Sequence, residues 1–287
     1  MNLTTPITLP ASPLKLDGES KVMLIGSCFA QEVGSRLQTM LGEEQVEVNP
    51  FGVQYNPLSI ERVLRLLMKA DKADAAVFEG RDGIYHSWFH TSHFSADEEA
   101  ECRDTINNAF CKSKDFLKQA TCLIITFGTT RCYRLNESGL IVSNCHKEPQ
   151  SCFTEVEPSL GEMMMQWRNL IDELRNFNPD MKVLFTVSPY RYRKYGFHES
   201  QLQKAKLLML VDDLQKAGAA YFPSYEIMLD ELRDYRFYAN DMLHPSDLAV
   251  DIITERFCEW TFTPELTLLS KENIKAQKRK AHRQIKV

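Results

Sequence analysis

The sequence predicts an α/β protein of three layers, in which helices cover both faces of a mostly parallel five-stranded sheet, with loop and hairpin insertions. Three continuous apolar runs, at residues 21–26, 121–128 and 181–187, are typical of strands buried on both faces. Amphipathic segments with apolar residues three or four apart separate these runs, as helices would. Because strands alternate with helices, we expect parallel crossovers within one domain rather than two domains.

The elements follow in order from the first strand, residues 21–27, which passes directly into a helix at Cys28. Two shorter strands are predicted near residues 46–52 and 219–224, the first of them broken by Asn49-Pro50 and Gly52. The predicted helices cover residues 28–41, 56–70, 97–119, 159–178, 199–218, 225–234 and 246–260.

Local signals place several helix ends. Asn56 followed by Pro57 predicts an N-cap and a first helical position, and Ser159 predicts another N-cap. Gly218 predicts a helix end. Two connections carry turn signals within aromatic or irregular sequence, one around residues 81–83 and one around residues 136–139, and each predicts a hairpin or an extended excursion.

Composition limits the class of protein. The net charge of −5, with 44% hydrophobic and 25% charged residues, gives no reason to expect a nucleic-acid partner. No apolar run approaches the roughly 20 residues of a membrane span. The first residues lack the pattern of a secretory signal, and the eight scattered cysteines form no zinc-ligand spacing, so we expect a cytoplasmic protein with reduced thiols. We divide the chain into an N-terminal extension (1–20), one α/β/α domain (21–262) and a basic C-terminal helix or tail (263–287).

Candidate chemistry lies where strands end, because ligands of such sheets bind outside the carboxyl ends of the strands. Ser27 follows the first strand, and Asp241 and His244 stand three residues apart before the last helix of the domain. A serine hydroxyl needs a base within hydrogen-bond reach, and a carboxylate on the other ring nitrogen of a histidine fixes its tautomer. Asp241 and His244 are also compatible with a simple loop brace.

Several blocks carry a resemblance to a known family. The motif "IGSCFA" at residues 25–30 is accompanied by "NPFGVQYNP", "NCHK", "TVSP", "HESQLQKAKLL" and "DMLHPS" further along the chain. With these blocks the chain resembles the GSCFA family, which is associated with the SGNH or GDSL hydrolases. The resemblance implies an SGNH-hydrolase or flavodoxin-like fold. It also implies Ser27 as nucleophile, His244 as base and Asp241 as the carboxylate that orients it.

The same resemblance assigns the oxyanion donors. Gly52 matches the glycine of the second block, and the backbone N–H of Ser27 is a further donor. The chain departs from the superfamily at Gly26, where an acidic residue usually precedes the serine. It departs again where Thr130 takes the place of the GxND asparagine. Asn144 is then a candidate to restore an amide donor from its loop.

Other residues are candidates for substrate contact. Cys28 fits either a small buried anchor of the first helix or a rival thiolate nucleophile at the helix N-terminus. Trp88 lies in an aromatic segment that is either a lid or a packed wall. His90 and His93 accompany His86 in that segment, but no acidic or cysteine ligand has a fitting spacing, so no metal site is predicted. The remaining substrate-binding candidates are Thr129, His146, His86 and Ser188.

These residues predict a serine-dependent hydrolase or acyltransferase for an ester, such as an O-acylated carbohydrate or another small ester. Its cycle needs no metal or organic cofactor. The alternative is a binding module on a hydrolase-like scaffold, because the chain lacks the GxND asparagine and the acidic residue before Ser27. The expected partner is a small-molecule or carbohydrate ester, with no nucleic acid and no membrane span. The sequence sets no oligomeric state.

Overall fold

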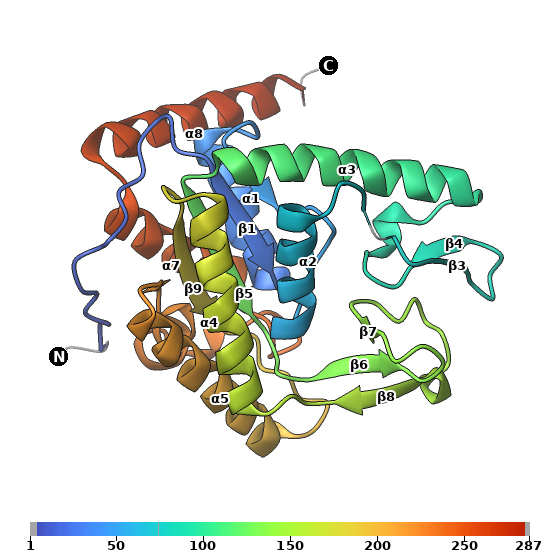
Figure 1. The fold of residues 1–287 in the computed structure, drawn as a ribbon. Helices are drawn as coiled ribbons and strands as arrows, with labels where there is room; N and C mark the ends of the chain where they lie inside the picture. The colour runs from blue at the N-terminus through green and yellow to red at the C-terminus, as the bar shows by residue number, and fades with distance from the viewer. Residues whose placement is uncertain (1–4, 74, 285–287) are drawn as a thin grey trace.

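The computed structural model describes residues 5–73 and 75–284 as a sheet covered by helices on both faces (Figure 1). All neighbouring strands of this five-stranded sheet run parallel, in the order β10-β9-β5-β1-β2. Their bounds are β1 Val22–Gly26, β2 Val46–Val48, β5 Cys122–Phe127, β9 Lys182–Val187 and β10 Ala220–Tyr221. The three-layer, parallel architecture predicted from the sequence is therefore confirmed.

The register aligns the carboxyl ends of the central strands. Gly26 of β1 lies opposite Thr126 of β5, which lies opposite Thr186 of β9. The residues that follow these positions consequently emerge side by side at one edge of the sheet. This edge is where a site is expected in a parallel sheet.

Alternate side chains of each strand enter different cores, as the strand period of two requires. Met23 and Ile25 of β1 pack in one cluster, whereas Val22 and Leu24 pack in the other. The first cluster lies under α2 (Pro57–Lys69), α3 (Glu99–Gln119), α4 (Leu160–Phe177) and α5 (Phe197–Lys216). The second lies under α1 (Cys28–Leu41), α7 (Asp247–Thr261) and the first turn of α8 (Pro264–Gln284).

Two antiparallel excursions extend from the α/β body, one after α2 and one after β5. The hairpin of β3 (Val77–Glu79) and β4 (Tyr85–Ser87) turns at residues 80–84, as predicted. A second excursion has three strands in the order β7-β6-β8, with bounds β6 Cys132–Leu135, β7 Ile141–Val142 and β8 Phe153–Val156. The turn signal at residues 136–139 predicted its β6-β7 hairpin, but not the return of β8. Figure 1 shows both excursions on the same side of the molecule.

Helix signals have mixed outcomes. Asn56 caps α2 with Pro57 in its first turn, and Ser159 forms a full capping box with Glu162, so both predictions are confirmed. The helix predicted over residues 225–234 is wrong in form, because it is a single turn of α6 (Ser224–Glu226) continued by a π-helical turn, η3 (Ile227–Glu231). Short 3₁₀ turns complete the connections as η1 (Ser92–Phe94), η2 (Gln150–Cys152) and η4 (Tyr235–Phe237).

The segment before β1 and the helix α8 both pack on the α/β body. Leu16 is fully buried, and its N–H donates to the carbonyl of Thr261 at 2.8 Å. The helix α8 contacts α1, where Asn273 Nδ2 donates to the carbonyl of Met40 at 2.8 Å. Within residues 5–73 and 75–284, no helix combines the length and the apolar character that crossing a bilayer requires.

Candidate active site

Ser27 sits in the tight turn between β1 and α1. Gly26 before it packs on β5 so closely that a Cβ there would lie 2.4 Å from the carbonyl oxygen of Thr126, and only glycine fits. The Gly26 N–H donates to Asn49 Oδ1 at 2.8 Å, which fixes the turn from the β2 side. Ser27 is therefore held at the carboxyl end of β1, next to the ends of β5 and β2.

The hydroxyl of Ser27 makes no hydrogen bond with the residues that the structure describes that would give it a structural role. Ser27 is the N-cap of α1, yet its side chain makes no capping hydrogen bond. Its Oγ is buried and has no hydrogen-bond partner among the described residues, and the residue is only 2% exposed. An N-cap serine usually accepts a backbone N–H of the first turn. A buried hydroxyl without a hydrogen-bond partner is costly and calls for an explanation, of which a catalytic role is one.

His244 and Asp241 form a hydrogen-bonded pair on the loop before α7. His244 Nδ1 lies 2.5 Å from Asp241 Oδ2, while Asp241 Oδ1 accepts the backbone N–H groups of Leu243 and His244 at 2.9 and 3.0 Å. The His244 backbone N–H, the His244 ring and the Leu243 N–H together hold the pKa of Asp241 far below its usual value. The carboxylate is thus ionised and can only accept, so Nδ1 of His244 carries a proton.

The loop that carries His244 contacts the segment that follows β9. Arg191 N–H donates to the carbonyl of Leu243 at 3.0 Å, and the ring of Tyr190 lies 4.2 Å from the His244 ring, centroid to centroid. These contacts direct His244 toward the strand ends. Ser27 and His244 line the same cavity, whose volume is about 580 Å³. A larger depression of about 750 Å³ runs along α2 and is lined by neither residue.

Four of the predicted substrate and oxyanion residues also line this cavity. They are Cys28, Thr129, Asn144 and Ser188. Thr129 Oγ1 donates to Gln203 Oε1 at 2.5 Å, so its hydroxyl is already engaged. Asn144 Oδ1 accepts the N–H of His146 at 2.9 Å, and its Nδ2 makes no hydrogen bond within the described part of the chain.

The predicted oxyanion donors Gly52 and Thr130 do not line the cavity. The Gly52 N–H donates to the carbonyl of Asn49 at 2.7 Å, closing a turn, and Thr130 is fully buried with its Oγ1 donating to Glu157 Oε1 at 2.6 Å. The Ser27 N–H is likewise used, as it donates to the carbonyl of Thr126 at 3.3 Å. The oxyanion roles of Gly52 and Thr130 stay predictions, and internal hydrogen bonds take up both donors in this structure.

His86, His146 and Trp88 are also placed away from the cavity. The rings of His86 and His146 stack at 4.5 Å, and Trp88 stacks on Phe78 at 3.6 Å. None of the three lines the cavity, so their substrate contacts stay predictions that this cavity does not support. Trp88 does support the site from behind, because its carbonyl accepts the N–H groups of Ser143 and Asn144 at 2.8 and 3.3 Å. Among the described residues, no cluster of three metal-ligating side chains occurs.

Cys28 is half-buried beside Ser27. Burial raises the pKa of its thiol, with the carboxylate of Glu32 adding to this effect, and backbone hydrogen bonds oppose it without cancelling it. The thiol is therefore protonated at neutral pH. This environment suits the packing role that the sequence analysis gave to Cys28 better than the rival role of a thiolate.

Lys204 is a site residue that the sequence analysis missed. It is 2% exposed, and its Nζ donates to the carbonyls of Gly128 and Ser188 at 2.7 Å each. Burial lowers its pKa to about 7. This side chain joins the exits of β5 and β9 through Gly128 and Ser188, which both line the cavity. One signal was available in the sequence, because Lys204 shares a helix face with Leu207 and Val211, where solvent is excluded.

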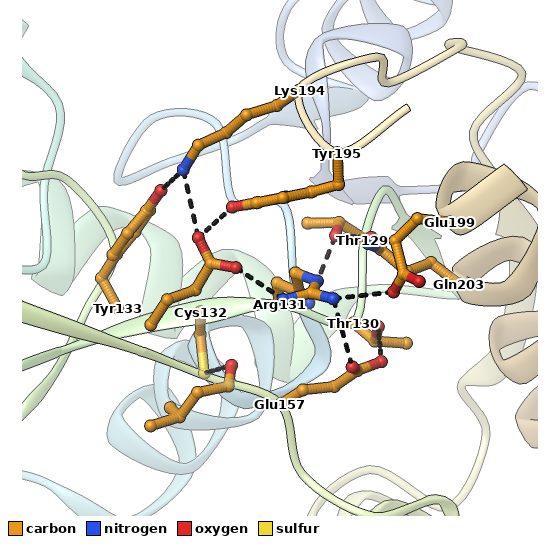
Figure 2. A network of polar contacts seen from close by, with 12 residues as sticks. Thr129, Thr130, Arg131, Cys132, Tyr133, Glu157, Lys194, Tyr195, Glu199 and Gln203 are labelled. Carbon is orange, nitrogen blue, oxygen red and sulfur yellow. Dashed lines mark hydrogen bonds and ion pairs between the residues drawn. The ribbon is translucent and has the colours of Figure 1, made fainter. Parts of the chain in front are cut away.

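One wall of the cavity is supported by a polar network around Arg131 (Figure 2). Its guanidinium bonds Glu155 at 2.8 Å and Glu199 at 2.7 Å, and lies 4.4 Å above the ring of Tyr195. Glu155 also accepts from Lys194 and Tyr195. Burial raises the pKa of Glu155, but these donors outweigh it and the pKa is lowered. The network ties β6 and β8 to the loop after β9.

Tyrosine side chains form a large part of the cavity lining. Their rings offer flat apolar faces and their hydroxyls offer hydrogen bonds. The five that line the cavity are Tyr55, Tyr133, Tyr190, Tyr192 and Tyr195. Such a wall suits a ligand with both apolar faces and hydroxyl groups.

The fold and the site together define a three-layer α/β protein with a serine and an Asp-supported histidine in one cavity at the carboxyl edge of its sheet. The chain belongs to the GSCFA family, whose model matches residues 21–257. A search of curated protein sequences found no match.

Solved structures of similar fold include several esterases. A family 3 carbohydrate esterase from Clostridium thermocellum is 12% identical, with coverage of 88% of this chain and 98% of that chain and a TM-score of 0.40. A variant of an acetylxylan esterase from Geobacillus stearothermophilus is 11% identical, covering 87% and 100%, with a TM-score of 0.44. A family 3 carbohydrate esterase from Talaromyces cellulolyticus is 10% identical, covering 88% and 99%, with a TM-score of 0.40.

Proposed function

We propose that this protein is a serine-dependent acyl-ester hydrolase or acyltransferase, with Ser27 as nucleophile, His244 as general base and Asp241 as its orienting carboxylate. One observation carries the proposal. The buried, unpartnered Ser27 hydroxyl shares a cavity with an imidazole whose Nδ1 is held by a carboxylate. Because Nδ1 carries the proton, Nε2 of His244 is the nitrogen left to accept one. In an unliganded site, catalytic hydrogen bonds are often long and tighten only with substrate.

The reaction follows from these roles. His244 Nε2 takes the Ser27 proton as Oγ bonds to the acyl carbon and the carbonyl oxygen gains negative charge. Collapse breaks the ester C–O bond, and the leaving alkoxide takes the proton from His244. Water or a second hydroxyl then attacks the acyl-serine in the same way, which returns Ser27. Water yields hydrolysis, whereas a hydroxyl of an acceptor yields transfer.

The tyrosine-lined wall supports an O-acylated carbohydrate, or another small ester of a polyol, as substrate. Sugar rings present apolar C–H faces that pack on aromatic rings, and their hydroxyls bond phenol groups. The carbohydrate esterases of similar fold are named for such substrates. The cavity volume of about 580 Å³ lies within the range for small-molecule sites.

Ester turnover tests the proposal. Purified protein is incubated with p-nitrophenyl acetate, butyrate and octanoate, beside Ser27→Ala and His244→Ala variants. We expect turnover by the wild type and its loss in both variants. Repeating the assay with a sugar acceptor and resolving products by mass separates hydrolysis from transfer. Turnover that survives unchanged in Ser27→Ala would refute the proposed nucleophile.

A second function, a non-catalytic binding module for such esters, is favoured by one observation. The N–H groups of Ser27 and Gly52 and the hydroxyl of Thr130 are all engaged in internal hydrogen bonds. A site without oxyanion donors would hold an ester without turning it over efficiently. Saturable binding of acetylated sugars by calorimetry, with no turnover of any ester, would decide for this function.

A further inference from the structure

Acyl transfer at Ser27 requires a hydrogen-bond donor for the developing oxyanion. The expected donors are already engaged in internal hydrogen bonds. Two backbone N–H groups of the β5 exit are also unavailable, because Gly128 and Thr129 both donate to the carbonyl of Tyr55, at 2.8 and 3.0 Å. A side-chain donor that lines the cavity is therefore needed, held firmly near Ser27.

The segment before α2 is bonded to Gly26, which precedes Ser27, and to the exit of β5. The Gln54 N–H donates to the carbonyl of Gly26 at 2.8 Å, and Tyr55 accepts the two N–H groups at the β5 exit. Gly128 makes this approach possible, since a Cβ there would lie 3.0 Å from the Tyr55 carbonyl and 3.5 Å from Ser27 Cβ. The backbone of residues 54–56 is thus clamped against the turn that carries Ser27.

Asn56 follows this clamp and lines the cavity. It is 7% exposed, and its Oδ1 accepts the Ser59 N–H at 2.9 Å as the N-cap of α2. The cap uses the oxygen and fixes the plane of the amide. Nδ2, by contrast, makes no hydrogen bond within residues 5–73 and 75–284. The positive end of the α2 dipole adds a favourable field for an anion at this place.

We infer that Asn56 Nδ2 is the side-chain donor that stabilises the oxyanion formed at Ser27. The inference rests on the proposed function and replaces the donors that internal bonds occupy. Asn144, the other free amide of the cavity, is held differently. Its backbone is bonded to Trp88 of the hairpin excursion and not to the strand ends beside Ser27. Asn56 is anchored to the same strand ends as the nucleophile, as preorganised stabilisation requires.

Replacing Asn56 with other cap-forming residues separates the effect of its amide group on catalysis from its effect as the N-cap of α2. Ser and Asp both serve well at an N-cap, so Asn56→Ser and Asn56→Asp should keep the thermal midpoint near that of the wild type. Loss of one oxyanion donor should lower kcat/KM for p-nitrophenyl acetate by about 100- to 1,000-fold. Ser159→Ala is the matched control, because it removes the cap of α4 at a residue that does not line the cavity, and it should lower the midpoint while leaving kcat/KM unchanged.

A boronic acid that forms a tetrahedral adduct with a serine gives a readout that a structural role would not move. Its inhibition constant should rise in Asn56→Ser in step with the fall in kcat/KM. The inference is overturned if Asn56→Ser keeps kcat/KM within about threefold of wild type, or if Asn144→Ala alone causes the loss. The proposed function would survive either result, provided that Ser27→Ala is inactive. A wild-type protein that turns over no ester would overturn both.

Discussion

The Nδ1 atom of His244 lies 2.5 Å from Oδ2 of Asp241, whose other oxygen accepts two backbone N–H groups of the same loop. The Asp241 carboxylate is thereby fixed by three donors, and it in turn fixes the tautomer of the imidazole. The base of the proposed reaction is built within four residues of sequence. Its orientation depends on the carboxylate rather than on packing alone.

Asp241→Asn should therefore impair catalysis more than folding. An asparagine amide can donate to Nδ1, which would move the ring proton to Nε2 and leave His244 unable to act as base. We expect kcat/KM to fall by roughly 1,000- to 10,000-fold. Steady-state ester hydrolysis measures this, with the exposed Asp247→Asn as control. A loss below about tenfold would mean that the pair is only a loop brace.

Cys28→Ala should leave the reaction nearly intact. The thiol is protonated at neutral pH, because burial raises its pKa, and its side chain packs beside the nucleophile. The variant should lose about 1 kcal/mol of unfolding free energy and retain ester turnover. Urea denaturation and an ester assay measure the two effects. Turnover that disappears in Cys28→Ala yet persists in Ser27→Ala would reverse the two assignments.

Arg131→Met should loosen the wall of the cavity. It leaves Glu155, Glu199 and Glu157 close together without their shared cation. These side chains keep some solvent contact, so we expect a loss of about 2 kcal/mol of unfolding free energy, less than for a fully buried pair. KM should rise more than kcat falls, because the network holds the tyrosine wall.

Arg236→Met is the matched control for this experiment, since Arg236 pairs with Asp234 at an exposed position. We expect it to change the unfolding free energy by less than about 1 kcal/mol. Equal effects of the two substitutions on both stability and KM would contradict the role given to the Arg131 network.

Lys204 should make stability depend on pH in a definite direction. Burial lowers its pKa to about 7, from roughly 10.4 in the unfolded chain. Between these values the unfolded state binds more protons, so the contribution of Lys204 to the unfolding free energy rises with pH. The difference between wild type and Lys204→Met should consequently grow in favour of the wild type from about pH 7 to about pH 10.

Chemical denaturation at several pH values tests this dependence, because effects of other groups cancel in the difference. The exposed Lys271→Met serves as the control and should show a constant difference from wild type. A constant difference for Lys204→Met as well would show that the ammonium group is not desolvated in the folded state.

The sheet could be predicted because its signals are local. The runs at β1, β5 and β9 are largely apolar, as is typical of strands buried on both faces. Asn56 and Ser159 predict helix starts because capping depends on residues close in sequence. Strand β8 was missed because its partner β6 lies about twenty residues earlier and no local turn joins the two. The π-helical turn at residues 227–231 buries Ile227 and Met228 in the core cluster that α7 covers, and no local pattern predicts it.

The site was predicted only in part, for a related reason. Ser27, Asp241 and His244 could be chosen because residue type and position after a strand indicate chemistry. Donor roles could not, since they depend on which N–H groups are already bonded. Gly52 closes its own turn, and Thr130 is used by Glu157. Asn56 was predicted only as an N-cap and Lys204 only as part of a helix, because their relation to the cavity depends on the fold.

Stoichiometric labelling tests the central claim, that Ser27 and His244 act together across one cavity. The wild type is treated with a fluorophosphonate, and the modified peptide is mapped by mass spectrometry. The account predicts a single adduct on Ser27, formed far more slowly in His244→Ala. An adduct on Cys28 or on a cavity tyrosine, or an equal rate in His244→Ala, would contradict it.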